Sequence, residues 1–225
     1  MKIILLKSFV ILLLSPGLWA TPDFTDWSSE RGFQRLERSE HKSDFFRIAN
    51  VFQAETQDAS AGARAAAILV AALEISKPEL LQELNQKFTQ KFNVGAPSLR
   101  DLRTALDEQI ISTRLYVMSE SDTLERIRDV LIASLLKSSE MLLVNFAYAD
   151  SQGEMVEVFA PLGAYEEESD SFLIMDLNPK RAPWKWIKAQ SLFHFMNTIS
   201  GEESRGFVII QSPVKSEDRT QVTQE

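Results

Sequence analysis

The segment at residues 61–75, AGARAAAILVAALEI, places the strongest constraint on the fold, because it is apolar almost all round a helix. Alanine, its commonest residue, has the highest helix propensity of all amino acids. A helix that is apolar all round is stable only when other elements cover it. The sequence therefore predicts a buried central helix, and Ser60 stands where a side chain could cap its first turn.

The first twenty residues have the pattern of a secretory signal peptide. Lys2 and Lys7 supply positive charge, residues 9–14 are apolar, and Ala20 offers a small residue for cleavage. The apolar run is shorter than the roughly 20 residues that a spanning helix needs, and no other stretch is apolar enough to span. We expect an exported protein, periplasmic or secreted. The alternative is an uncleaved N-terminal anchor.

The balance of charge is acidic. The chain has 32 acidic and 24 basic residues, so its formal net charge is −8. Removal of residues 1–20 takes away two lysines and no acids, which gives 22 − 32 = −10 for the mature chain. This charge opposes binding to nucleic acids and to anionic membranes. We expect no nucleic-acid partner, and contact with a membrane only through the N-terminal signal.

The chain contains no cysteine and two histidines, His41 and His194. The missing cysteine excludes a thiolate nucleophile, a disulfide and a cysteine-ligated metal, and two histidines argue against a His-rich metal site. We therefore expect no metal and no cofactor. His41 lies in a charged stretch and is predicted to be solvated, and His194 is predicted to be an ordinary helix residue.

Apolar periodicity predicts helices in the first half of the chain and strands in the second. After a short helix within residues 30–42, the predicted helices are 61–75, 78–92, one capped by Ser98, one after Ser121, and a last one from Pro183 to about Thr198. The predicted strands are 112–118, 141–148, 155–165, 171–177 and 206–211. The order predicts an α+β fold, a helical half followed by an antiparallel-sheet half, with a cleft between them as the natural site. We expect one domain over residues 21–211 and a disordered tail over 212–225.

Residues 57–73, QDASAGARAAAILVAAL, resemble the nucleophile segment of phytochelatin synthases. In that family an aromatic residue, the catalytic cysteine and a glycine open a central helix. Gly62, Ala72 and Leu73 match the family pattern. Ala61 stands at the cysteine position, and Ser60 stands at the position of the preceding aromatic residue.

Residues 158–165, VFAPLGAY, resemble the family segment that carries the catalytic histidine. The matching residues are Phe159, Pro161, Ala164 and Tyr165, and Val158 stands at the histidine position. Residues 169–187 are similar to the segment that follows, in which Asp176 matches the third catalytic residue. Pro183 and Trp186 also match, whereas Pro179 stands where the family has an arginine.

The resemblance extends from about Trp27 to Gln211 and implies a papain-like fold. It also places Glu55 where the family has a glutamine that helps to bind the oxyanion. The family transfers a γ-glutamylcysteine unit from one glutathione to another and so builds metal-chelating peptides. That chemistry needs a thiolate, a histidine that moves the proton and an aspartate that orients the histidine. Ala61 and Val158 cannot supply the first two, so we predict a catalytically inactive pseudoenzyme that binds a small thiol peptide or a protein partner.

Two other functions stay open. The first is an enzyme with residual or altered transferase or hydrolase chemistry on glutathione-like peptides, which would use the retained Asp176, with Glu55 as a second carboxylate. The second is a structural or regulatory partner of an active paralogue. Ser60 is predicted to be a helix cap and not a substitute nucleophile, because no base stands at position 158.

Several prominent residues are predicted to have structural roles. Asp176, without a histidine to orient, is predicted to be a locally paired carboxylate. The acidic turn of Glu166, Glu167, Glu168 and Asp170 is predicted to be a solvated loop, since its spacing is not that of a calcium loop. Trp186 is predicted to pack in the core, and Trp184 to be partly exposed.

Overall fold

A computed structural model describes residues 23–52, 61–73, 78–92, 97–109, 111–181, 184–201 and 203–212. The predicted signal peptide and most of the predicted tail lie outside these residues. Among the helices of the described part, none is both long and apolar enough to cross a membrane.

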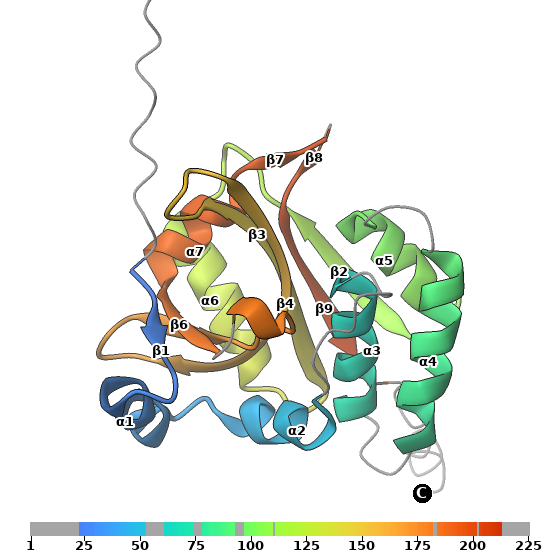
Figure 1. Cartoon of the computed structure of the whole chain (residues 1–225), viewed down its shortest axis with the longest axis horizontal. Coiled ribbons are helices and arrows are strands. Elements are labelled where there is room, and N and C mark those ends of the chain that lie inside the picture. The colour runs from blue at the N-terminus through green and yellow to red at the C-terminus, as the bar shows by residue number, and fades with distance from the viewer. Residues whose placement is uncertain are drawn as a thin grey trace, which may run out of the picture.

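Seven of the described strands form one sheet in which every neighbouring pair is antiparallel (Figure 1). In spatial order they are β1 (Thr25–Asp26), β6 (Lys185–Lys188), β5 (Ser171–Ile174), β4 (Met155–Glu166), β3 (Glu140–Ala149), β9 (Gly206–Gln211) and β2 (Ser112–Val117). A separate hairpin pairs β7 (Ile199–Ser200) with β8 (Glu203–Ser204). The long strands β3 and β4 form the middle of the sheet and carry several of the residues discussed below.

The described helices cover both faces of the sheet. They are α1 (Glu30–Arg38), α2 (Ser43–Val51), α3 (Ala61–Leu73), α4 (Pro78–Lys91), α5 (Leu99–Asp107), α6 (Leu124–Leu135) and α7 (Ala189–Met196), with a 3-10 turn η1 (Pro179–Arg181). Leu143 and Phe159 share one core cluster with α3, α4 and α5, whereas Leu142 and Val158 share another with α6 and α7. Because alternate residues of a strand point to opposite faces, the sheet separates two apolar cores (Figure 1).

Helix α3 is the buried central helix that its sequence predicts. Residues 65–69 have no exposed surface, and α3 packs against α2, α4, α5, β3 and β4. Its first turn lies especially close to its neighbours, since a Cβ atom on Gly62 would lie 2.9 Å from Leu102 Cδ1 and 3.2 Å from the Phe159 ring. Small residues therefore let this helix approach both α5 and β4.

The segment after β5 differs from the prediction. Residues 185–188 form β6, and the last helix begins at Ala189, so the helix predicted to open at Pro183 is wrong; Pro183 itself lies outside the described residues. The physical reason is alternation along the strand, because Trp186 and Ile187 fill opposite cores of the sheet with no exposed surface. Trp186 is in the core as predicted, where its Nε1 donates to the Gly32 carbonyl at 3.0 Å.

Two helices begin where their sequences predict. Ser98 caps α5, and Asp101 completes a capping box with it. Helix α6 begins at Leu124, after Ser121, and the Thr123 side chain accepts the hydrogen bond of its first turn.

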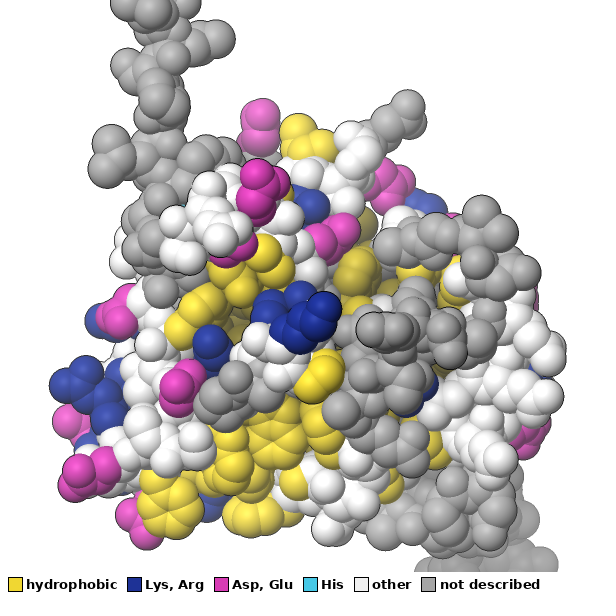
Figure 2. All heavy atoms as spheres, viewed as in Figure 1, with side chains coloured by type: hydrophobic (Ala, Val, Ile, Leu, Met, Phe, Trp, Pro, Cys, Tyr) yellow, Lys and Arg dark blue, Asp and Glu magenta, His cyan; other side chains and the backbone are white. Residues whose placement is uncertain are grey.

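Aromatic side chains gather between β1, α2 and the start of β6. Trp184 lies 5.4 Å from Trp27, 5.7 Å from Phe45 and 4.8 Å from Phe52, measured between ring centroids. Trp184 is partly exposed, as predicted. Figure 2 shows apolar side chains at the α1–α2 end of this face, where Phe33 and Phe46 are about half exposed (49% and 55%).

Candidate functional site

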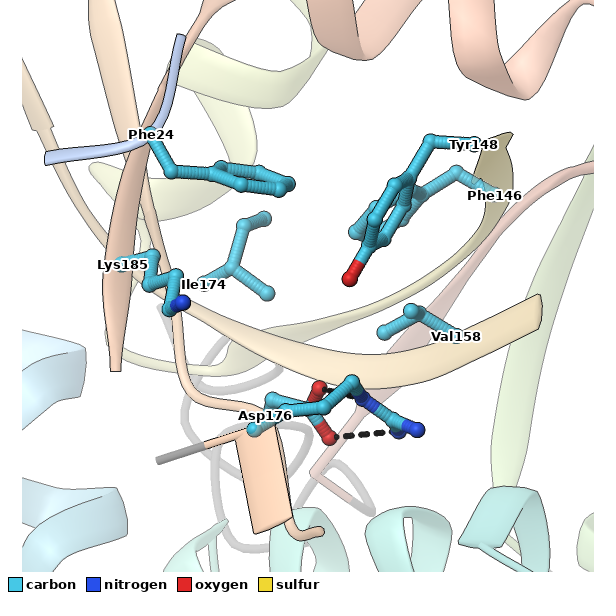
Figure 3. Close-up of a pocket in the computed structure, with 8 residues that line it drawn as sticks. Phe24, Phe146, Tyr148, Val158, Ile174, Asp176 and Lys185 are labelled. Carbon is cyan, nitrogen blue, oxygen red and sulfur yellow. Dashed lines mark hydrogen bonds and ion pairs between the residues drawn. The ribbon is translucent and has the colours of Figure 1, made fainter. Parts of the chain in front are cut away.

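A small pocket, whose empty space of about 290 Å³ includes the open solvent at its mouth, lies where four strands and the turn η1 meet. Its lining consists of Phe24, Phe146, Tyr148, Val158, Ile174, Asp176, Arg181 and Lys185. Figure 3 shows Phe24, Tyr148 and Val158 around the hollow, with the Asp176 carboxylate on the opposite side from Phe24. Two of the three residues matched to the catalytic triad, Val158 and Asp176, therefore share one pocket.

Antiparallel pairing brings Val158 and Asp176 together. Val158 of β4 lies opposite Phe146 of β3, and β4 then pairs with β5 through Leu162 and Ile174. Just beyond β5, the backbone N–H of Met175 donates to the carbonyl of Pro161 at 3.0 Å. The chain after β5 thus runs beside β4, and Asp176, the residue after Met175, lies next to the strand that carries Val158.

Asp176 forms a two-point ion pair with Arg181. Arg181 donates from Nε to Oδ2 at 2.5 Å and from Nη2 to Oδ1 at 3.0 Å, and the backbone N–H of Asn178 also donates to Oδ1 at 3.0 Å. Both carboxylate oxygens are therefore occupied, and the side chain is only 14% exposed. The prediction of a locally paired structural carboxylate is confirmed.

Two further polar groups line the pocket. The Tyr148 hydroxyl points into it (Figure 3), and burial raises the pKa of this phenol, with Asp176 and Asp150 acting in the same direction and Arg181 against it. The phenol is therefore protonated at neutral pH and can donate a hydrogen bond. The Lys185 ammonium lies 5.6 Å from the centre of the Phe24 ring and 3.9 Å from Asp26 Oδ1.

Ala61, matched to the nucleophile, is the first residue of α3 and is half-buried. The next residue, Gly62, lies against the Phe159 ring, and Phe159 follows Val158 on β4. The first turn of α3 therefore lies close to β4 at this point. Ala61 is not among the described residues that line the pocket, since Phe159 faces α3 and Val158 faces the other core.

The remaining residues predicted for the site, Glu55 and Ser60, lie outside the described residues. In the part of the chain that the structure describes, no group of three or more His, Asp and Glu side chains is arranged to hold a metal ion.

The acidic turn is solvated only in part, because Glu167 and Glu168 are exposed whereas Glu166 is buried. Glu166 is 2% exposed and accepts hydrogen bonds from the Ser169 backbone N–H at 3.0 Å and its hydroxyl at 2.5 Å, while Asp170 accepts from the Tyr165 hydroxyl at 2.8 Å. Arg38 and Arg128 pair with these two carboxylates, at 3.3 and 3.2 Å. Of the acidic residues in this turn, Glu168 is the most exposed, at 74%.

His41 also differs from its prediction. Its side chain is 12% exposed, and Nε2 lies 3.0 Å from Glu167 Oε1. The backbone pairs as well, since the N–H of Tyr165 donates to the carbonyl of His41 at 3.0 Å. Long-range contacts that a charged local sequence does not reveal therefore bury this histidine. His194 lies in α7 and is exposed, in agreement with an ordinary helix residue.

Sequence reasoning missed Tyr148, Arg181 and Lys185 as pocket residues. One signal was available for Tyr148, because Phe146 and Tyr148 are two apart on a strand and so point to the same face. The sequence around Arg181 and Lys185 did not indicate a pocket, since basic residues that follow a predicted strand are common in exposed turns.

The comparison with family models agrees with this geometry. The model of the family described as phytochelatin synthase matches residues 19–207, which is most of the chain. A search of curated proteins found no match. The antiparallel sheet, the helical half and the buried helix that opens at Ala61 fit the papain-like fold of that family. The chain therefore belongs to the phytochelatin synthase family.

Proposed function

We propose that this protein is a catalytically inactive member of its family, which keeps the glutathione-related transferase scaffold and acts by binding a small thiol peptide or a protein partner. The proposal is carried by one observation. The positions matched to the nucleophile and the base are occupied by Ala61 and Val158. An alanine has no nucleophilic atom, and a valine has no group that can accept a proton.

The arrangement of two of the three matched positions supports the alignment on which this proposal depends. Val158 and Asp176 line one pocket, as a histidine and the aspartate that orients it would. Ala61 opens α3 on the side of β4 that Phe159 faces, and it does not line this pocket.

The expected loss of turnover is large enough to distinguish an inactive protein from a slow enzyme. Removal of the nucleophile or base of a catalytic triad lowers turnover about a millionfold. The rate that remains is roughly 10³–10⁴ times the uncatalysed rate in water, and it comes from substrate binding and stabilisation of the oxyanion. Glu55 at the oxyanion position would oppose the developing negative charge if it were ionised. We therefore expect the acyl-enzyme route to be absent.

The contacts of Asp176 argue against altered carboxylate chemistry in the same pocket. Acid–base chemistry by two carboxylates needs a second carboxylate in the pocket. Among the described residues that line the pocket, Asp176 is the one carboxylate, and Arg181 and the Asn178 backbone N–H hold it through hydrogen bonds.

The direct test is an activity assay with purified mature protein, glutathione and Cd²⁺ or Zn²⁺. Free glycine, γ-glutamylcysteine and its oligomers are measured by chromatography against a blank without protein. We expect no product above the blank. Product formation by the wild-type chain that survives repurification and scales with protein concentration would overturn the proposal.

A reconstruction tests the alignment separately. The double variant Ala61→Cys/Val158→His restores the two missing groups, and each single variant serves as its control. We expect weak acyl transfer at best from the double variant and none from either single variant, because Glu55 and Pro179 still depart from the family. A signal that requires both changes would support the assigned roles, whereas equal activity in all variants would contradict them.

We also propose that the protein is exported. The support is the charged start, apolar run and small cleavage residue within residues 1–20. Mass spectrometry of the protein from a fractionated native host tests this, with an N-terminus at Thr21 as the expected result. An intact N-terminus in the membrane fraction would favour an anchor instead.

A further inference from the structure

We infer that the start of α2, residues 41–47, is a pH-sensitive junction that holds α2 against β4 more tightly at mildly acidic than at alkaline pH. We call this segment the α2 junction. Asp44 is the titrating group of this junction. The inference is independent of the proposed function, because Asp44 belongs neither to the pocket nor to the matched catalytic positions.

Asp44 is a buried carboxylate at the contact between α2 and β4. Its side chain is 1% exposed, and neither Oδ1 nor Oδ2 has a hydrogen-bond partner among the described residues. The next residue, Phe45, lies against β4, where its Cα would be 3.5 Å from a Cβ on Gly163. Ionisation of Asp44 therefore places an unsolvated charge at the contact between α2 and the sheet, which disfavours that contact.

The nearest cation compensates this charge only in part. Arg47 Nη1 lies 3.5 Å from Asp44 Oδ1, but the same atom donates to the carbonyl of Ser138 at 2.7 Å. Burial raises the pKa of Asp44 to about 7, and Arg47 and Ser43 act against this shift. An unfolded aspartate has a pKa of about 3.9. Between about pH 4 and pH 7 the folded chain therefore binds a proton at Asp44 that the unfolded chain lacks. The contribution of Asp44 to stability therefore falls as pH rises from about 4 to about 7.

His41 lies at the entry to α2, beside β4. Its Nε2 lies 3.0 Å from Glu167 Oε1, on the turn that follows β4. The backbone N–H of Tyr165 donates to the carbonyl of His41 at 3.0 Å. These contacts tie the chain to β4 just before the buried Asp44.

The other charged groups around the junction have their own partners. Glu166 of β4 is held by Ser169 and Arg38, and Asp170 by Arg128 of α6. Lys42 donates to the carbonyls of Leu36 and Glu37 at the end of α1. Helix α3 also packs against α2, and its one charged residue is Arg64. The charged group that lowers the pKa of Asp44 is Arg47. Among the residues that the structure describes, Asp44 is therefore the group whose protonation changes the junction.

The test is hydrogen exchange measured by mass spectrometry at about pH 5.5 and pH 8, corrected for the intrinsic exchange rates of the amides. The peptide that covers α2 reports on the junction, and a peptide from α6 is the internal reference. We expect α2 to be protected about tenfold more at the lower pH, a change of about 1.4 kcal/mol. The α6 peptide should change much less.

A variant assigns the effect to Asp44. Asp44→Asn should remove most of the pH dependence and leave α2 well protected at pH 8. The matched control is Glu40→Gln, which removes one negative charge from an exposed residue next to His41 and should leave the dependence unchanged. Thermal unfolding of the wild-type protein across the same pH range provides a readout that needs no variant.

Three results would overturn the inference. They are equal corrected protection of α2 at both pH values, greater protection at pH 8, or a Glu40→Gln effect as large as that of Asp44→Asn.

Discussion

Arg181 holds Asp176 through two parallel hydrogen bonds, one to each carboxylate oxygen. Pro179 stands where the family resemblance calls for an arginine, and Arg181 supplies a guanidinium two residues later. The loop after β5 thus contains a pairing of carboxylate and guanidinium although its sequence departs from the family pattern.

A double-mutant cycle on Asp176→Asn and Arg181→Met should give a coupling free energy of about 1–2 kcal/mol, because the pair is two-point and mostly shielded from water. Chemical denaturation measures the free energy of unfolding of the four proteins. The exposed pair Arg100 and Glu203, at 56% and 44% exposure, is the control and should couple by less than about 1 kcal/mol. Equal coupling in both pairs would contradict the role assigned to burial.

Glu166→Gln should lower the free energy of unfolding by about 1–3 kcal/mol, because a buried carboxylate loses charge-assisted hydrogen bonds from Ser169 and Arg38. Burial acts to raise the pKa of Glu166, but these donors outweigh it and leave the pKa below its ordinary value. The stabilisation is therefore complete above the unfolded pKa of about 4.3 and is lost as pH falls through the lower folded pKa. Denaturation at neutral and acidic pH should show the two proteins converging in acid. Glu168→Gln, at 74% exposure, should change stability by less than about 0.5 kcal/mol.

Gly32→Ala should destabilise the protein by about 2 kcal/mol or more. An added Cβ would lie 2.0 Å from the Asp26 carbonyl oxygen and 2.7 Å from Trp27 Cα, which are backbone atoms and cannot rotate away. The shift would also disturb the hydrogen bond from Trp186 to the Gly32 carbonyl. Gln34→Ala on the exposed side of α1 is the control, and its melting temperature should stay close to that of the wild type. A stable Gly32→Ala protein would show that α1 can move away from β1.

Ser98→Ala should cost about 1 kcal/mol of unfolding free energy, since it removes the acceptor for the Asp101 backbone N–H and half of the capping box. Ser121→Ala should cost almost nothing, because Ser121 is exposed and Thr123 caps the following helix. Thermal denaturation of the two variants distinguishes them. Equal losses would mean that Ser121 also stabilises the start of α6.

The sequence predicted those elements whose own residues determine their structure. Helix α3 was predictable because an alanine-rich apolar segment has few alternatives to a buried helix. The start of α5 was predictable from Ser98, since capping is a local interaction. Val158 and Asp176 were assigned to one site by resemblance alone, and antiparallel pairing of β4 with β5 is what brings them together.

Elements that depend on distant partners were not predictable in this way. Their position after Pro183 led to the prediction of a helix for residues 185–188. They form a strand because they pair with the edge of β5, and because Trp186 and Ile187 each fill one of the two cores. His41 and Glu166 looked solvated because their sequence neighbours are charged. Their burial arises from contacts with residues more than 100 positions away, such as that between Arg38 and Glu166.

The packing of α3 has a consequence for how such a protein loses its chemistry. Alanine contacts and the approach of Gly62 to Phe159 fix the start of this helix, and neither depends on a side chain at position 61 that reacts. Val158 is likewise an apolar member of a core, at 1% exposure. The apolar packing that keeps the chain folded therefore also fixes the backbone at positions 61 and 158, whatever chemistry the side chains at these two positions can perform.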